Sequence, residues 1–132
     1  MTLPDSDGKE YTIHFTALFS SSSSATTPLL FLHGWPGTFL EFLDLLDLLR
    51  KKYSAKDLPY NVVVPSLPGY AFSEGPSLDR QWSLQDASVL VDKLMVGLGL
   101  SGYVSQGGDI GSFMSRILSV DSEHCKAVHR KY

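Results

Sequence analysis

Cysteine and long apolar runs are scarce in this sequence. Its single cysteine, Cys125, excludes an internal disulfide, and a chain without disulfides is typical of a reducing compartment. No apolar run is long enough to span a membrane, and the polar residues 1–10 do not resemble a secretory signal. We therefore expect a cytoplasmic protein with no membrane segment.

The sequence also lacks the patterns that hold metals and phosphates. It contains neither H-E-x-x-H nor paired cysteines, and no glycine-rich loop matches a phosphate-binding signature. The net charge of −3 is too small to indicate a nucleic-acid partner. We expect no metal and no cofactor, and no feature of the sequence indicates an oligomeric state.

What the sequence does contain is enough apolar material for one packed domain. Hydrophobic residues make up 43% of the 132 residues, and short apolar runs alternate with amphipathic segments. Strands are predicted at residues 11–19, 29–32, 62–64, 103–105 and 125–129, and helices are predicted to begin near residues 38, 83 and 110. This alternation predicts an α/β fold, with a mostly parallel sheet and helices on both faces.

Local signals mark where two helices begin and where the chain is irregular. Thr38 with Glu41, and Ser83 with Asp86, have the spacing of helix capping boxes. Residues 20–28 are serine, alanine, threonine and proline, with little to bury. That composition predicts a flexible surface loop between two strands.

Two glycine-rich turns follow predicted strands, at residues 33–37 and 107–111. Ligands of open parallel sheets bind at the carboxyl ends of the strands, so both turns are expected at that edge. The second turn, GGDIG, has the pattern of a nucleophile elbow, with Asp109 in the position of the usual serine. Aspartate is also a common helix N-cap, which leaves a structural role for Asp109 as the alternative.

An aspartate in such an elbow suits attack on a saturated carbon. Its carboxylate is ionised at neutral pH, and the ester that it forms must then be hydrolysed by water. The second step needs a general base and an oxyanion hole. The backbone amides of Ile110 and Trp35 are the candidate donors to that hole.

Three segments resemble the epoxide hydrolases of the α/β-hydrolase fold, in their microsomal-type branch with its fungal members. The segments are HGWPG at residues 33–37, PSLPGYAFS at residues 65–73 and QGGDIGS at residues 106–112. The resemblance implies that Asp109 opens a small-molecule epoxide and that Trp35 and Ile110 supply the oxyanion-hole amides. It also implies a cis peptide bond before Pro36.

The same resemblance limits what this chain is expected to do alone. In the family the catalytic histidine, its acidic partner and the cap tyrosines all come later than residue 132. Residues 1–132 would therefore form a truncated α/β-hydrolase core, without the cap domain and the C-terminal catalytic part. We expect the isolated chain to be inactive as a complete hydrolase.

Two other functions are compatible with these residues. A haloalkane dehalogenase uses the same aspartyl ester, but members of that group typically place tryptophan after the nucleophile, where this chain has Ile110. A non-catalytic role as a truncated remnant is the second alternative. A serine esterase is disfavoured, because the sequence has no G-x-S-x-G.

The other conspicuous side chains have mainly structural interpretations. His33 is expected to bond neighbouring backbone, and His14 is expected to be solvated on the polar face of a strand. His129, at the end of a predicted strand, is a minor candidate for a base near the site. Tyr70 and Phe72 are candidates either for the wall of the site or for the core.

Overall fold

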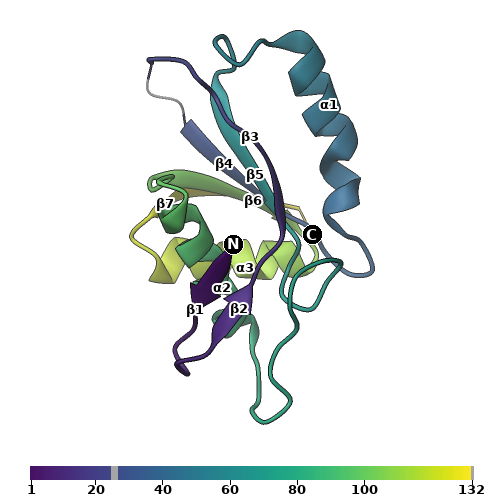
Figure 1. The fold of residues 1–132 in the computed structure, drawn as a ribbon, viewed down its shortest axis with the longest axis vertical. Helices are drawn as coiled ribbons and strands as arrows, with labels where there is room; N and C mark the ends of the chain where they lie inside the picture. Colours follow the sequence, from purple (N-terminus) through teal and green to yellow (C-terminus); the bar gives the residue numbers. More distant parts are fainter. Residues whose placement is uncertain (25–26, 132) are drawn as a thin grey trace.

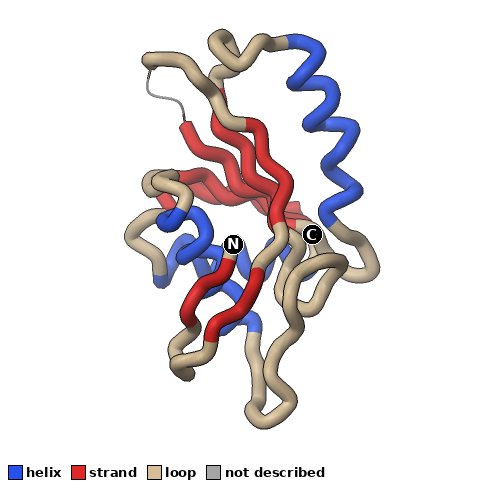
Figure 2. Tube along the Cα trace, viewed as in Figure 1, coloured by secondary structure: helices blue, strands red, loops and turns tan. Residues whose placement is uncertain are grey.

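The computed structural model describes residues 1–24 and 27–131, which form two sheets and the helices that cover them (Figure 1). In chain order the elements are β1 (Thr2–Pro4), β2 (Glu10–Thr12), β3 (Phe15–Leu18), β4 (Thr27–Leu32), η1 (Phe39–Phe42), α1 (Leu43–Lys52), β5 (Tyr60–Pro65), α2 (Leu84–Gly97), β6 (Tyr103–Gly108), α3 (Ile110–Asp121) and β7 (Cys125–Lys131). Figure 2 shows the strands of the larger sheet in the centre, with helices on either side.

The larger sheet sets the geometry of the site. Its strand order is β3-β5-β4-β6-β7, in which β3 is antiparallel to β5 and the other neighbours are parallel. Leu32 of β4 pairs with Gly107 of β6, so these two strands end side by side. The two glycine-rich turns therefore leave the sheet at the same edge, as the sequence predicts.

Alternation along β5 divides the core between the two faces of the sheet. Val63 belongs to a large buried cluster with Leu90 of α2, and this cluster also includes residues of α3. Val62 and Val64 point to the other face and pack with Leu46 of α1. The prediction of helices on both faces of a mostly parallel sheet is thus confirmed.

The strand predicted at residues 11–19 is interrupted, and this part of the prediction is wrong. β2 ends at Thr12 and β3 begins at Phe15, because the chain leaves a small antiparallel sheet and enters the larger one. The alternation continues through the break, since Ile13 is fully buried. The missed partner of β2 is β1, whose three residues are too few to show a period.

His14 lies in this interruption and is not solvated as predicted. Its ring packs against the rings of Phe39 and Phe72, with centroid separations of 4.8 and 5.1 Å. Its Nδ1 lies 2.8 Å from the Ser66 hydroxyl, and its backbone N–H donates to the hydroxyl of Ser73. The break in the strand turns the side chain toward the loop after β5, which a pattern of period two does not reveal.

The predicted flexible loop at residues 20–28 is tied to the fold at both of its described ends. The hydroxyl of Ser20 donates to the carbonyl of Leu58 at 2.7 Å. Thr27 and the residue after it already belong to β4, where they pair with β5. Residues 25–26 lie outside the described part of the chain.

Of the two predicted capping boxes, one is confirmed. Ser83 and Asp86 exchange both hydrogen bonds of a capping box at the start of α2. At the other position the chain first forms the short helix η1, whose cap is the Thr38 hydroxyl accepting the N–H of Leu40. The side chain of Glu41 takes no part in that cap, so this second prediction is wrong.

Glycines make the elbow between β6 and α3 possible. A Cβ atom on Gly111 would overlap the carbonyl oxygen of Leu32 and lie 2.9 Å from that of His33. A Cβ atom on Gly107 would overlap the carbonyl of Gly111. The first turn of α3 therefore presses against the end of β4, and the residue between the two glycines stands out at the edge of the sheet.

We predict that Gly111→Ala lowers the free energy of unfolding by about 2–3 kcal/mol, because overpacking against rigid backbone has costs of this order. Gly108→Ala is the matched control in the same turn, since its Cβ would lie 3.6 Å from its nearest neighbour, the carbonyl oxygen of Lys131. Urea unfolding followed by circular dichroism measures both values. Equal losses in the two variants would contradict the steric explanation.

Candidate active site

Asp109 occupies the tip of the elbow in a backbone conformation that few residues other than glycine adopt. Its φ is 49° and its ψ is −124°. Strained conformations of this kind concentrate at functional sites, where the surrounding structure enforces them. Asp109 is the residue at the N-cap position of α3, but its side chain makes no capping hydrogen bond of the usual kind to that helix.

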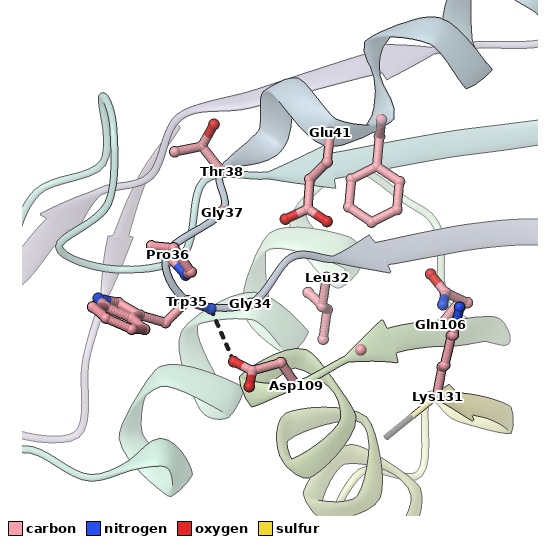
Figure 3. Close-up of a pocket in the computed structure, with 12 residues that line it drawn as sticks. Leu32, Gly34, Trp35, Pro36, Gly37, Thr38, Glu41, Gln106, Asp109 and Lys131 are labelled. Carbon is pink, nitrogen blue, oxygen red and sulfur yellow. Dashed lines mark hydrogen bonds between the residues drawn. The ribbon is translucent and has the colours of Figure 1, made fainter.

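Two backbone amides hold the Asp109 carboxylate. Trp35 donates its N–H to Oδ1 of Asp109 at 2.9 Å (Figure 3). The amide of Trp35, followed by that of Ile110, lowers the pKa of Asp109 below its ordinary value of 3.8, because both hydrogen bonds favour the charged form. The structure thus brings together the three residues that the sequence singled out.

The turn at residues 33–37 can approach the elbow because of Gly34. A Cβ atom at this position would lie 2.5 Å from Cβ of Asp109 and 2.7 Å from its Oδ1. The Trp35–Pro36 peptide bond is cis, as the family resemblance implies. The amide that follows Gly34 therefore reaches the carboxylate directly across the ends of two neighbouring strands.

An open pocket of about 740 Å³ lies beside Asp109 at this edge of the sheet. Its wall consists of Leu32, Gly34, Trp35, Pro36, Gly37, Thr38, Glu41, Phe42, Gln106, Gly108, Asp109 and Lys131. Figure 3 shows the Trp35 turn and Asp109 on one side of this space, with Gln106 and Lys131 on the other. The wall is mainly apolar side chain and glycine backbone, which suits a small organic molecule with few polar atoms.

The sequence analysis does not assign four polar side chains of this pocket to the site: Thr38, Glu41, Gln106 and Lys131. Thr38 and Glu41 have the spacing of a capping box, which conceals their position in the pocket. Lys131 lies beyond the predicted end of the last strand, but β7 extends to it and pairs it with Gly108. The position of Gln106 at the site can be inferred from the sequence, because it comes directly before the elbow on the strand that leads to the site.

His33, the first residue of the turn, has the structural role that the sequence predicts. It is buried, its Nε2 accepts the N–H of Leu67 at 3.0 Å, and its ring meets that of Tyr70 edge-on. Burial lowers the pKa of His33 and so favours the neutral ring. Neither Tyr70 nor Phe72 lines the pocket, and the exposed His129 does not line it either.

The described residues contain no group of three or more His, Cys, Asp or Glu side chains arranged to hold a metal ion. Cys125 is a free, buried thiol, and burial raises its pKa, which makes it a poor nucleophile. No helix in the described ranges is both long and apolar enough to cross a membrane.

Comparison with known proteins identifies the family. The family model described as alpha/beta hydrolase fold matches residues 27–129, and the one described as epoxide hydrolase N terminus matches residues 2–42. A Dothistroma septosporum protein whose name assigns it to the epoxide hydrolases is 48% identical over 122 residues, which are 92% of this chain and 29% of that protein. Epoxide hydrolase 1 of Sus scrofa is 38% identical over 112 residues, which are 82% of this chain and 24% of the pig protein.

A solved structure agrees with these relatives. The structure of Aspergillus niger epoxide hydrolase matches 99% of this chain with a TM-score of 0.91 and 49% sequence identity. The chain covers 33% of that structure, and it spans between about a quarter and a third of the length of the relatives named above. The resemblance seen in three sequence motifs is confirmed: the chain belongs to the α/β-hydrolase fold family and corresponds to the N-terminal part of its epoxide hydrolases.

Proposed function

We propose that this chain forms the nucleophile-bearing part of an epoxide hydrolase, in which the Asp109 carboxylate opens an epoxide. The observation that carries the proposal is the 2.9 Å hydrogen bond from the Trp35 N–H to Oδ1 of Asp109, beside an open pocket. This bond joins the ionised carboxylate of Asp109, a residue with a strained backbone, to an N–H donor that is already in place. The names of the pig and Aspergillus niger relatives supply the substrate class.

In the first step an Asp109 oxygen attacks an epoxide carbon, and the bond between that carbon and the epoxide oxygen breaks. The products are an ester on Asp109 and an alkoxide, which takes a proton from solvent. The lowered pKa of Asp109 keeps the carboxylate ionised, so the attack needs no base. Because Trp35 occupies Oδ1, the attacking atom is Oδ2.

The second step is hydrolysis of this ester by water at Cγ of Asp109. Oδ1 is then the ester carbonyl oxygen, and it carries the negative charge of the tetrahedral intermediate. The amides of Trp35 and Ile110 already face that carboxylate, so they serve as an oxyanion hole without rearrangement. This step explains why the turn at residues 33–37 lies so close to the elbow.

The two alternative functions fit the same geometry less well. A haloalkane dehalogenase needs a donor for the departing halide, whereas the Ile110 side chain has no N–H and packs against the core. A non-catalytic role gives no reason for the strained backbone of Asp109 or for the amides that face its carboxylate.

We predict that styrene oxide alkylates the 132-residue chain once, on Asp109, and that Asp109→Asn abolishes this adduct. The amide has the size of the carboxylate but is a far weaker nucleophile. Intact-protein mass spectrometry followed by peptide mapping measures the added mass and its position.

The matched control for this test is Asp44→Asn, which removes an exposed carboxylate of α1 that does not line the pocket. It is expected to be alkylated at the wild-type rate. An Asp109 that neither the epoxide nor a haloalkane modifies in folded wild-type protein would leave only the non-catalytic role. Modification of Asp109 by a haloalkane but not by the epoxide would favour dehalogenase chemistry.

The pH dependence of alkylation provides a second test. Since amide hydrogen bonds lower the pKa of Asp109, the carboxylate stays ionised as the pH falls toward the ordinary value of 3.8. We expect the alkylation rate to be flat from pH 8 to about pH 4.5 and to reach half its maximum below pH 3.8. Adduct formation is measured together with the folded fraction from circular dichroism, and a half-maximal rate above pH 3.8 would refute the expected shift.

The isolated chain is also predicted to show no sustained turnover. Among the described residues that line the pocket there is no histidine, so a fast general base for the ester step is missing. Excess styrene oxide should therefore yield about one ester per chain, lost more slowly than it forms. Continuous diol production by the pure chain, followed by chromatography, would contradict this expectation.

A further inference from the structure

A second hollow, the aromatic slot, lies where the segment between β5 and α2 meets the N-terminal parts of α2 and α3 (Figure 1). It has a volume of about 200 Å³, and two aromatic side chains, Tyr70 and Trp82, form part of its wall. Aliphatic side chains also line it, among them Leu67 from the segment, Ala87 from α2 and Met114 from α3. This composition suits an apolar ligand group.

Contacts outside the aromatic slot fix the ring of Trp82. The Tyr11 ring meets the Trp82 ring at an angle of 65°, with the centroids 5.1 Å apart. The guanidinium of Arg80 lies over the Trp82 ring, 4.6 Å from its centroid. Arg80 is held in turn by ion pairs with three carboxylates, those of Asp5, Asp7 and Asp86. Because these contacts order the indole before any ligand arrives, binding against it costs little conformational entropy.

Tyr70 and Ile110 connect the aromatic slot to the nucleophile. The Tyr70 ring meets that of His33 edge-on, with the centroids 5.1 Å apart. His33 begins the turn from which the Trp35 N–H donates to Asp109. Ile110 lines the slot, and its amide faces the Asp109 carboxylate. Since neighbouring Cα atoms are about 3.8 Å apart, a group bound against Ile110 lies beside the attacking residue.

We propose that the aromatic slot binds the ring of an aryl epoxide while the Asp109 carboxylate attacks the epoxide carbon. The inference rests on the proposed function and narrows its substrate class to epoxides that carry an aromatic ring. A phenyl group fits the slot, since an apolar cavity of roughly 150 Å³ is large enough for benzene. Aromatic pairs also attract one another beyond the burial of their surface, so Tyr70 and Trp82 determine the specificity.

A charged substituent does not suit the aromatic slot. No side chain of its described wall is charged, and the Ser83 hydroxyl in that wall already bonds to Asp86 at 2.6 Å. A charge buried there would lack a partner. The open pocket beside Asp109 is a poorer match for a phenyl ring, because Glu41 and Lys131 belong to its wall. The ring is therefore expected in the slot and not in the open pocket.

The test compares two epoxides that differ in the aromatic ring, styrene oxide and propylene oxide. Each is incubated with the 132-residue chain, and ester formation on Asp109 is followed by intact mass and peptide mapping. Ala87→Leu adds three carbon atoms to the wall of the slot without removing a contact. We expect this variant to react about tenfold more slowly with styrene oxide, since differences in apolar pockets have effects of this order. Its rate with propylene oxide should change less than twofold.

Two further variants separate specificity from a loss of structure. Val89→Leu enlarges a side chain of the same helix that lines a separate hollow between α2 and α3, and it should leave both rates unchanged. Trp82→Leu removes one ring of the slot and should lower the ratio of the styrene oxide rate to the propylene oxide rate. A general loss of structure would slow both epoxides alike, and circular dichroism measures the folded fraction of each variant.

A binding measurement tests the slot without any reaction. Trp35→Phe keeps the Trp35 backbone amide and leaves Trp82 as the only tryptophan of the chain. Benzyl alcohol should then change the fluorescence of Trp82 in a saturable way, whereas 1-propanol should not. Adding Ala87→Leu to this variant should abolish the saturable change, and adding Val89→Leu should preserve it.

The outcomes distinguish the slot from the proposed function. Ester formation that Ala87→Leu leaves unchanged for both epoxides, or slows equally for both in folded protein, overturns the role of the slot and leaves the nucleophile intact. Benzyl alcohol that binds equally well after Ala87→Leu, or not at all, also overturns it. If neither epoxide modifies Asp109, the proposed function is refuted, while saturable binding that Ala87→Leu abolishes still supports an aromatic site.

Discussion

The contact between the turn at residues 33–37 and the elbow is the constraint on which the site depends. Trp35 and Asp109 are 74 residues apart in the sequence, yet a single hydrogen bond joins them. That bond exists because β4 and β6 are parallel neighbours that end in register, and because Gly34 has no side chain to keep the two segments apart. The sheet thus places two residues that are far apart in the sequence next to each other at one edge.

Support for this contact extends outward in layers. The ring of His33, the first residue of this turn, accepts a hydrogen bond from the N–H of Leu67 in the loop after β5. The same loop is held from its other side by His14, which contacts Ser66 and Ser73. The strand β2 of the small sheet leads directly into His14. The small sheet therefore supports the turn at residues 33–37 indirectly, although the two are separated in the sequence.

The sequence predicts those parts of the molecule whose geometry is set locally. The capping box of Ser83 and Asp86 and the glycine spacing around Asp109 each determine a turn within a few residues, and both are found as expected. The positions that the sequence does not predict depend on contacts with segments far away in the chain. The inward turn of His14 follows from the exchange of one sheet for another, and the reach of Lys131 follows from pairing with β6. Neither effect can be seen in the hydrophobic pattern of the segment in which it occurs.

The two faces of the sheet carry very unequal cores. Among the residues that the structure describes, sixteen buried ones form the cluster on the side of α2 and α3. Four buried ones, Phe39, Leu46, Val62 and Val64, form the cluster beneath α1. Local opening requires less free energy where fewer buried contacts are lost, so η1 and α1 should exchange their amide hydrogens well before α3. Asp109 is anchored to the robust half and Glu41 to the labile half. Local opening of η1 is therefore expected to displace the Glu41 side of the pocket before the elbow that carries Asp109 moves.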